Sequence, residues 1–331
     1  MEHNNNFNLM RLIFSIMVVF SHSYGLLALS EPIILNRTFG NFAVHCFFVL
    51  SGYLITNSFL KSKGIIEFTY RRVLRILPAF LVAYILSKIL VKIFNGFSNN
   101  PVPYIVNGNV WTLSWEILAY IICAFVGFLG LLKAESLGTI WLAAWVGIII
   151  FIDSQLPMYQ IVVPMLFLFL AGSFLAVNGE KLKIPYTGLL SVLLLILMEI
   201  KPQAISKIIG FFPWLYSPSL PYNVINYFLY LLILPFALIY IGKYLPFKLN
   251  LKNDISYGVY IYTWPIQQVI VFIFLKQAIP LSPLLLFVLS ILTSSIISGI
   301  SWKFIEKPAL SLKRIDLYSL FTSQKDKLLK G

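Results

Sequence analysis

Charged residues are scarce in this 331-residue chain. They make up 11% of the sequence, against about 25% in an average soluble domain. Only 12 Asp and Glu accompany 25 Lys and Arg, and the chain has just two cysteines and three histidines. So little charge excludes a disordered chain, and two cysteines exclude a disulfide-rich secreted scaffold. The sequence also lacks internal repeats and low-complexity tracts, which excludes collagen and coiled coils.

Hydrophobic residues take the place of the missing charges. They make up 59% of the chain, and its mean hydropathy is +0.87, which is more apolar surface than a soluble globule can bury. We therefore predict an all-α, polytopic membrane protein with about ten transmembrane helices. The apolar runs that predict these spans are residues 8–29, 40–60, 74–94, 111–132, 138–152, 160–177, 185–200, 223–242, 255–275 and 282–302, of which 138–152 and 185–200 are short.

The basic residues predict how these spans are oriented. With ten spans and the N-terminus inside, the inside segments carry 19 of the 25 Lys and Arg, and the outside segments and outer helix ends carry 6. Because Lys and Arg stay on the cytoplasmic side, we predict that both termini are cytoplasmic and that the loop from Asn95 to Asn109 faces outward. The net charge of +13 then reflects topology, and we expect no nucleic-acid partner. No cleavable signal peptide is evident, so the first run should remain as a span.

Two ionisable residues lie within the first predicted span, where charge is costly and each such residue is a candidate for function. Arg11 and His22 are eleven positions apart, which at 100° per residue leaves them about 20° apart around the helix and about 16 Å apart along it. Ser15 and Val18 lie between them on the same face. Arg11 alone would also fit a cytoplasmic anchor, and His22 would fit a structural histidine bonded to a neighbouring helix.

Glu116 is the one carboxylate that falls well inside a predicted span, because Glu199 and Asp254 fall at span ends, in contact with interfacial water. It should lie about 7 Å below the outer face, at a depth similar to that of His22. A histidine and a carboxylate at similar depth are the minimum for general acid–base catalysis, in which the carboxylate orients the imidazole and stabilises its charged form. A structural pair or a protonated Glu are the alternatives. His45 has no such partner in view, so we interpret it as structural.

Three arginines gather at the inner end of the third predicted span. Arg71 and Arg75 share a helix face, and Arg72 lies beside them. Three guanidiniums are more than topology requires, and their forked donors suit a phosphorylated cytoplasmic ligand. Contact with anionic lipid headgroups is the alternative, and Glu67, four residues before Arg71, would pair with it.

Six blocks along the chain resemble motifs of the acyltransferase 3 family, bacterial integral-membrane O-acyltransferases that modify surface polysaccharides. The first is the pair formed by Arg11 and His22. The others are residues 47–56 (FFVLSGYLIT), 71–78 (RRVLRILP), 111–116 (WTLSWE), 256–265 (SYGVYIYTWP) and 304–308 (FIEKP). One block alone is weak, but six in the family's order cover nearly the whole chain. The resemblance makes residues 1–310 a transmembrane acyltransferase domain and 311–331 a short basic cytoplasmic tail.

The resemblance also implies an activity. It implies a multi-pass enzyme of the bacterial cytoplasmic (inner) membrane that moves an acetyl group from cytoplasmic acetyl-CoA, without a metal, to a sugar hydroxyl of a surface or lipid-linked polysaccharide of O-antigen or exopolysaccharide type. We also expect contacts with membrane lipids. A homo-oligomer is an alternative to a monomer that the sequence does not decide.

The site residues follow from the same motifs. We assign catalysis to His22, Glu116 and Arg11, with His22 either as general base or as the acceptor of the acetyl group. Coenzyme A is a polyphosphate, so its phosphates are assigned to Arg71, Arg72 and Arg75. The residues assigned to the acceptor are Ser51, Trp111, Ser114 and Tyr120.

One position departs from the family's pattern. Relatives often carry His just before Trp-Pro, where this chain has Thr263, so the main chemistry falls on His22 and Glu116. Two other interpretations stay open. A ten-helix transporter for a glycan or lipid-linked sugar would also contain intramembrane charges, but it needs broken helices or a repeat, which the sequence lacks. A structural or regulatory membrane protein would tolerate the loss of Arg11, His22 and Glu116.

Overall fold

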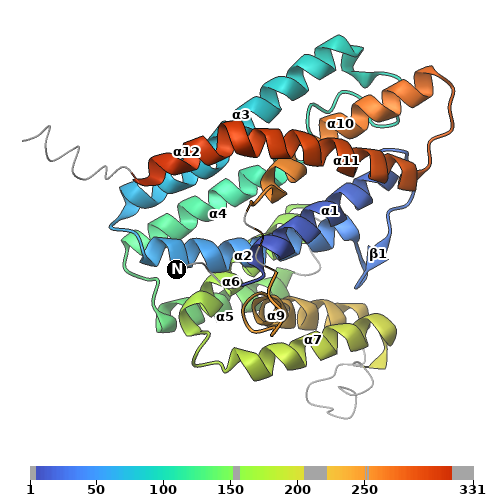
Figure 1. The fold of residues 1–331 in the computed structure, drawn as a ribbon. Coiled ribbons are helices and arrows are strands. Elements are labelled where there is room, and N and C mark those ends of the chain that lie inside the picture. The colour runs from blue at the N-terminus through green and yellow to red at the C-terminus, as the bar shows by residue number, and fades with distance from the viewer. Residues whose placement is uncertain (1–4, 152–156, 205–221, 250, 252, 315–331) are drawn as a thin grey trace, which may run out of the picture.

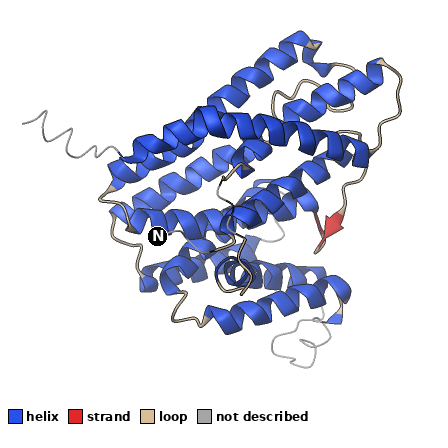
Figure 2. Cartoon of the chain, in the orientation of Figure 1, coloured by secondary structure: helices blue, strands red, loops and turns tan. Residues whose placement is uncertain are grey.

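The computed structural model describes residues 5–151, 157–204, 222–249, 251 and 253–314. Within these ranges the chain is almost entirely helical (Figures 1 and 2). Eight of the described helices are long and apolar enough to cross a membrane, and two shorter apolar helices, Ala134–Ile148 and Ile184–Ile200, accompany them. The prediction of an all-α, polytopic membrane protein is confirmed.

The helices are labelled as in Figure 1. They are α1 (Phe7–Gly25), α2 (Phe39–Leu60), α3 (Ile65–Ile93), α4 (Val110–Phe128), α5 (Ala134–Phe151), α6 (Pro157–Asn178), α7 (Ile184–Ile200), α9 (Tyr222–Lys243), α10 (Ser256–Lys276) and α11 (Pro283–Ser301). After α11 the helix continues through a π-helical turn (Trp302–Glu306) into α12 (Lys307–Ser311) and a 3-10 turn (Leu312–Arg314). A short 3-10 turn (Asn95–Phe97) follows α3, and the antiparallel strands β1 (Ile33–Ile34) and β2 (Arg37–Thr38) form a hairpin between α1 and α2.

The predicted spans match these helices to within a few residues, with one exception. α3 begins at Ile65, nine residues before the span predicted at 74–94. Its first turns contain Glu67, Arg71 and Arg72, whose charges lower the local hydropathy without preventing a helix. The arginine cluster is therefore helical throughout, with its spacing fixed by the helix.

Local sequence sets where two of the helices begin. The hydroxyl of Thr38 accepts a hydrogen bond from the backbone N–H of Asn41 at the start of α2 (3.2 Å). Ser282 accepts one from the N–H of Leu285 at the start of α11 (3.2 Å). Such caps satisfy N–H groups that a helix start leaves unpaired. The cap at Thr38 leads the hairpin directly into α2 and places Arg37 and Asn41 at the same end of the bundle.

α2 is the central helix of the described bundle and packs on α1, α4, α6 and α9. Two glycines let α2 and α6 cross closely. A Cβ atom on Gly52 would lie 1.9 Å from the carbonyl oxygen of Phe169, and one on Gly172 would lie 2.1 Å from that of Val49. Any larger residue would force the two helices apart. The glycine of the block at 47–56 is thus a packing residue, and it fixes the position of its neighbour Ser51.

The helices form three tiers in Figure 1. α3, α10, α11 and α12 run along one side of the molecule, α5, α6 and α7 along the other, and α1, α2 and α4 lie between them. The middle tier carries His22, Ser51 and Glu116. The helices that carry these three residues therefore lie between two outer layers of helices (Figure 1).

The start of α3 and α12 lie on the same side of the molecule, opposite the β1–β2 hairpin (Figure 1). Asn6, just before α1, donates to the carbonyl of Phe247 (2.9 Å), and Tyr70, near the start of α3, donates to that of Leu312 (3.2 Å). The charge distribution predicts that this side is cytoplasmic, and we call it the inner side. Most of the predicted basic tail, residues 315–331, lies outside the described residues.

Candidate active site

A small cavity between α1, α2, α4 and α10 brings Arg11 and Glu116 together; we call it the inner cavity. It measures about 40 Å³ and is lined by Arg11, Val44, Phe47, Phe48, Ser51, Thr112, Leu113, Glu116, Ser256, Tyr257 and Tyr260. The Glu116 carboxylate accepts hydrogen bonds from the hydroxyls of Ser51 (3.0 Å) and Tyr120. Two of the residues assigned to the acceptor, Ser51 and Tyr120, are therefore direct partners of a residue assigned to catalysis.

Asp254 holds Arg11 at the inner end of this cavity. Its Oδ2 accepts hydrogen bonds from Arg11 Nη1 (2.8 Å) and from Arg75, while its Oδ1 accepts from the Ser256 N–H (3.2 Å). Burial alone would raise the pKa of Asp254, but the guanidiniums of Arg11 and Arg75 and the bonds from Ser256 hold it well below its ordinary value. The expectation that Asp254 lies in interfacial water is wrong, since the residue is 8% exposed. Two cations cover it and join α1, α3 and the start of α10.

The predicted arginine cluster lies beside this ion pair. Arg71 pairs with Glu67 (2.5 Å), as expected, and Arg72 donates to the hydroxyl of Ser58 (3.2 Å). The Nε atoms of Arg71 and Arg72 are buried without a hydrogen-bond partner. Lys313 completes the cluster: burial, and then the charges of Arg72, Arg75 and Arg71, lower the pKa of Lys313 to about 7. Four cations therefore face the inner side, and two of them have a carboxylate partner.

His22 lines a second cavity, which we call the outer cavity. It measures about 210 Å³ and is lined by Val18, His22, Glu31, Thr38, Gly40, Asn41, Val44, Asn109, Trp111, Thr112, Ile161 and Tyr260. His22 lies in the last turn of α1, its ring meets that of Trp264 edge-on at 5.1 Å, and its Nδ1 is buried without a partner. The carboxylate that lines this cavity is Glu31, which accepts from the Ser21 hydroxyl.

The two cavities share a wall. Val44, Thr112 and Tyr260 line both of them. The hydroxyls of Thr112 and Tyr260 are hydrogen-bonded, and Tyr260 also donates to the carbonyl of Asn109 (3.3 Å). Thr112 lies one helical turn before Glu116 on α4, so the wall separates the level of Glu116 from that of His22. In the part of the chain that the structure describes, His22 and Glu116 line different cavities, one on each side of this wall, and no hydrogen bond joins them.

The comparisons with known proteins identify the family of the chain. A family model described as an acyltransferase domain, acyltransferase 3, matches residues 4–303. The chain belongs to the acyltransferase 3 family. An "O-acetyl transferase" of Shigella phage Sf6 is 27% identical to it over 94% of this chain and 97% of its own length. "Nodulation protein 10" of Rhizobium leguminosarum bv. viciae is 27% identical over 42% of this chain and 40% of its own length. No solved structure matches.

Membership of the acyltransferase 3 family makes this chain an O-acyltransferase of the membrane, with multiple spans. The predictions of the family and of an acyl-transferring enzyme are confirmed. The transporter alternative has no support in these comparisons.

The motifs of the acyltransferase 3 family meet in space around the inner cavity. Arg11 and Arg75 share Asp254, which lies two residues before the block at 256–265. Ser51 and Glu116 join the second block to the fourth. In the last block, Glu306 is 2% exposed and accepts from Ser301 (3.2 Å). Five of the six blocks, all but 304–308, thus contribute to one constellation around the inner cavity.

Three positions that the sequence analysis singled out do not line the inner cavity. Trp111 lines the outer cavity and is 47% exposed. Ser114 lies on an exposed face of α4 and lines neither the inner nor the outer cavity. Thr263, where relatives often have His, is buried and donates to the carbonyl of Val259 in its own helix. The hydroxyl of Thr263 is therefore engaged within α10.

Sequence reasoning missed Glu31, Tyr260 and Lys313. Glu31 lies in the loop after α1, Tyr260 is one aromatic among many in an apolar helix, and Lys313 follows the last helix among other basic residues. No local pattern marks any of them. Asp254 carried a signal, because a lone acidic residue next to a motif block is a natural partner for the arginines of other blocks.

Proposed function

We propose that this acyltransferase 3 protein moves an acetyl group from cytoplasmic acetyl-CoA to a sugar hydroxyl of a lipid-linked or surface polysaccharide, in the bacterial cytoplasmic membrane. The observation that carries this proposal is the pair of adjoining cavities, one beside a cationic cluster and one containing His22. A donor from the inner side and an acceptor from the outer side would meet at the wall formed by Thr112 and Tyr260. The name of the phage relative supports acetyl as the group transferred.

The cationic cluster suits the phosphates of coenzyme A. Arg71 and Arg75 are partly neutralised by Glu67 and Asp254, so we assign the strongest phosphate contacts to Arg72 and Lys313. Planar guanidinium donors and a lysine point charge are both typical phosphate ligands. Because the inner cavity has a volume of only about 40 Å³, we expect donor binding to move the side chains that line it.

His22 would act as the general base in a direct transfer. Its imidazole takes the proton of the sugar hydroxyl while the hydroxyl oxygen attacks the thioester carbonyl. The carbon–sulfur bond then breaks, and the coenzyme A thiolate takes the proton from the imidazolium. Glu31, in the same cavity, would stabilise that imidazolium. Arg11 would stabilise the negative charge that develops on the carbonyl oxygen.

Glu116 would serve the donor side of the wall. Its carboxylate is fixed by Ser51 and Tyr120, one turn deeper than Thr112. From there it would orient the donor's arm through the hydroxyls that surround it. The transfer would then need both sides of the wall at once, His22 to activate the acceptor and Glu116 to position the donor.

The test is acetyl transfer in membranes. Membranes with the wild-type protein, incubated with acetyl-CoA labelled in the acetyl group, should transfer label to a glycan, and membranes with His22→Ala should not. Glu116→Gln should also lower the transfer, and its matched control is Glu135→Gln, which changes an exposed carboxylate at the start of α5. Equal transfer by well-inserted His22→Ala would refute the assignment of the base. Recovery of an acetylated His22 peptide would favour the alternative in which the imidazole carries the acetyl group.

A further inference from the structure

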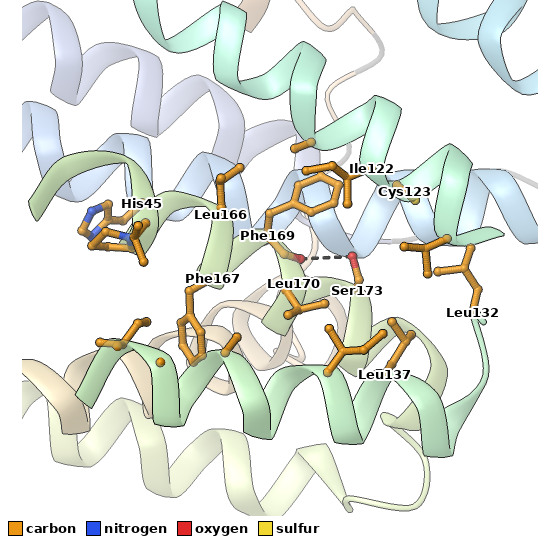
Figure 3. Close-up of a pocket in the computed structure, with 18 of the residues that line it drawn as sticks. His45, Ile122, Cys123, Leu132, Leu137, Leu166, Phe167, Phe169, Leu170 and Ser173 are labelled. Atoms are coloured by element: carbon orange, nitrogen blue, oxygen red, sulfur yellow. Dashed lines mark hydrogen bonds between the residues drawn. The ribbon is translucent and has the colours of Figure 1, made fainter. Parts of the chain in front are cut away.

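A third cavity lies away from the two just described, between α2, α4, α5 and α6 (Figure 3). Its volume is about 620 Å³, within the range of about 300–1,000 Å³ that is typical of ligand pockets. His45 lies at one end of the side chains drawn in Figure 3, and Leu132 and Leu137 lie at the other. We call this the long cavity.

The long cavity has the length and the lining of a hydrocarbon site. On α5 alone it extends from Leu137 to Ile148, eleven residues and therefore about 16 Å. Along this length its walls are almost wholly aliphatic and aromatic, with Cys123 and Ser173 as the polar exceptions. α5 packs on α6 and makes little contact with α4. The cavity therefore lies between α4 and α5 at the depth of the apolar spans. At that depth the surrounding solvent consists of lipid chains.

One end of the long cavity is polar. Arg37, Asn41 and His45 line it at intervals of four residues, from β2 into α2. The Arg37 guanidinium lies 3.9 Å from the centre of the Tyr230 ring and donates to the carbonyl of Leu35 (2.8 Å). His45 is 2% exposed; its Nδ1 lies 3.0 Å from the Tyr230 hydroxyl, and its Nε2 is buried without a partner. A cation and an unsatisfied imidazole nitrogen at one end of an apolar cavity suit an anionic headgroup.

The polar end also adjoins the outer cavity. Asn41 lines both cavities. A headgroup held at Arg37 would therefore lie next to the space that contains His22. A hydrocarbon chain, a phosphate and a sugar attached to it would fit the long cavity, its polar end and the outer cavity in that order.

From this arrangement we infer that the long cavity binds the hydrocarbon chain of a lipid phosphate that carries the acceptor sugar, with the phosphate at Arg37. The part of this inference that makes the sugar the acceptor rests on the proposed function. The part that places a lipid phosphate in the long cavity rests on the cavity alone. It names the acceptor by its chemistry: a sugar attached through phosphate to a long hydrocarbon chain in the membrane.

A cavity-filling substitution tests the inference. Gly147 lines the long cavity, and a Cβ atom on it would meet nothing within 4 Å, so the ring in Gly147→Phe would enter open space. Gly299 on α11 has the same open surroundings and does not line the cavity, so Gly299→Phe is the matched control. Arg37→Gln removes the charge at the polar end, and Arg37→Lys keeps it.

The binding probe is hexadecyl phosphate with a photoreactive diazirine near the end of its chain, in phosphatidylcholine vesicles that contain the purified protein. Label should appear on α4, α5 and α6, and excess unlabelled hexadecyl phosphate should remove it, whereas hexadecanol should not. Gly147→Phe should lose this label and Gly299→Phe should keep it. Arg37→Gln should weaken competition by hexadecyl phosphate roughly 10–150-fold, the effect of one lost charged hydrogen bond, and Arg37→Lys should restore most of it. Equal labelling of wild type and Gly147→Phe would overturn the inference.

A second readout separates this inference from the proposed function. Native membranes with labelled acetyl-CoA should yield label in the fraction extracted by organic solvent, and Gly147→Phe should lose that label. If both proteins label this fraction equally, the enzyme acts without the long cavity and the inference fails while the function stands. If wild-type membranes transfer no acetyl group at all, the proposed function fails, and the hexadecyl phosphate labelling alone decides whether the cavity binds lipid.

Discussion

Lys313 should make donor binding depend on pH in a way that no arginine can. In the free protein its pKa is lowered to about 7 by burial and by the neighbouring guanidiniums. A bound phosphate would favour the charged amine and raise this pKa again. Binding then takes up a proton, so the affinity for acetyl-CoA is highest below the pKa of the free protein and falls as the pH rises through it.

The size of the effect follows from the pKa. With a pKa of about 7, Lys313 is charged in about 90% of molecules at pH 6 and in about 10% at pH 8. If the bound state keeps it charged throughout, the dissociation constant rises at most about tenfold over this window. The donor's phosphomonoester, with a second pKa of about 6, gains charge in the lower half of the window and acts in the opposite direction. Because the phosphomonoester contributes equally to wild type and to Lys313→Arg, a comparison of these two proteins isolates the contribution of Lys313.

The assay is the binding of acetyl-CoA to purified protein at constant ionic strength from pH 6 to pH 8. Lys313→Arg keeps a permanent charge, so its affinity should not fall as the pH rises and should change only through the charge gained by the phosphomonoester. Lys313→Met should bind weakly throughout, while Lys133→Met, at an exposed lysine before α5, should behave as wild type. If Lys313→Arg shows the same loss of affinity with pH as wild type, Lys313 does not contact the donor.

Four further outcomes are expected. His22→Ala should lower the rate of acetyl transfer by about 10²–10⁴-fold, and Glu116→Gln should lower it as well. Because the two residues act on opposite sides of the wall, their losses should add in the double variant; a double variant little worse than either, measured in membranes with equal protein levels, would show that they act as one unit. Arg72→Gln should raise the KM for acetyl-CoA roughly 10–150-fold and leave that for the acceptor unchanged; an unchanged donor KM would make the cluster a lipid contact. Asp254→Asn should cost about 3–5 kcal/mol of stability, because it leaves two guanidiniums near the protein interior without a counter-charge, and thermal unfolding in detergent would reveal this as a lower Tm. A reporter active only outside the cytoplasm should give signal when fused after Asn100 and none when fused at the C-terminal end; the reverse pattern would contradict the predicted orientation.

The helices could be predicted from the sequence because the hydropathy of a span depends only on consecutive residues. Each apolar run contains its own evidence of a span, and the first residue of α3 was missed because Arg71, Arg72 and Glu67 interrupt the run without ending the helix. The shared face of Arg11 and His22 was predictable for the same reason, since helical periodicity depends only on spacing.

The partners of these residues were not predictable, because they depend on how separate helices pack. Arg11 meets Asp254 across 243 positions, and Ser51 meets Glu116 across 65. The matched depth of His22 and Glu116 placed them near one another but could not reveal that Thr112 and Tyr260 lie between. Glu31 comes from a loop, whose path through space has no periodic pattern to indicate it.

The wall formed by Thr112 and Tyr260 bears on the permeability of the membrane. An enzyme that admits one substrate from each face creates two water-accessible pockets that approach each other in the bilayer, and ions or protons would leak wherever they joined. Here the aromatic ring of Tyr260, whose hydroxyl is bonded to that of Thr112, stands between the two cavities. Tyr260→Ala would open this barrier, and cells that express it should lose membrane potential whatever its rate of acetyl transfer.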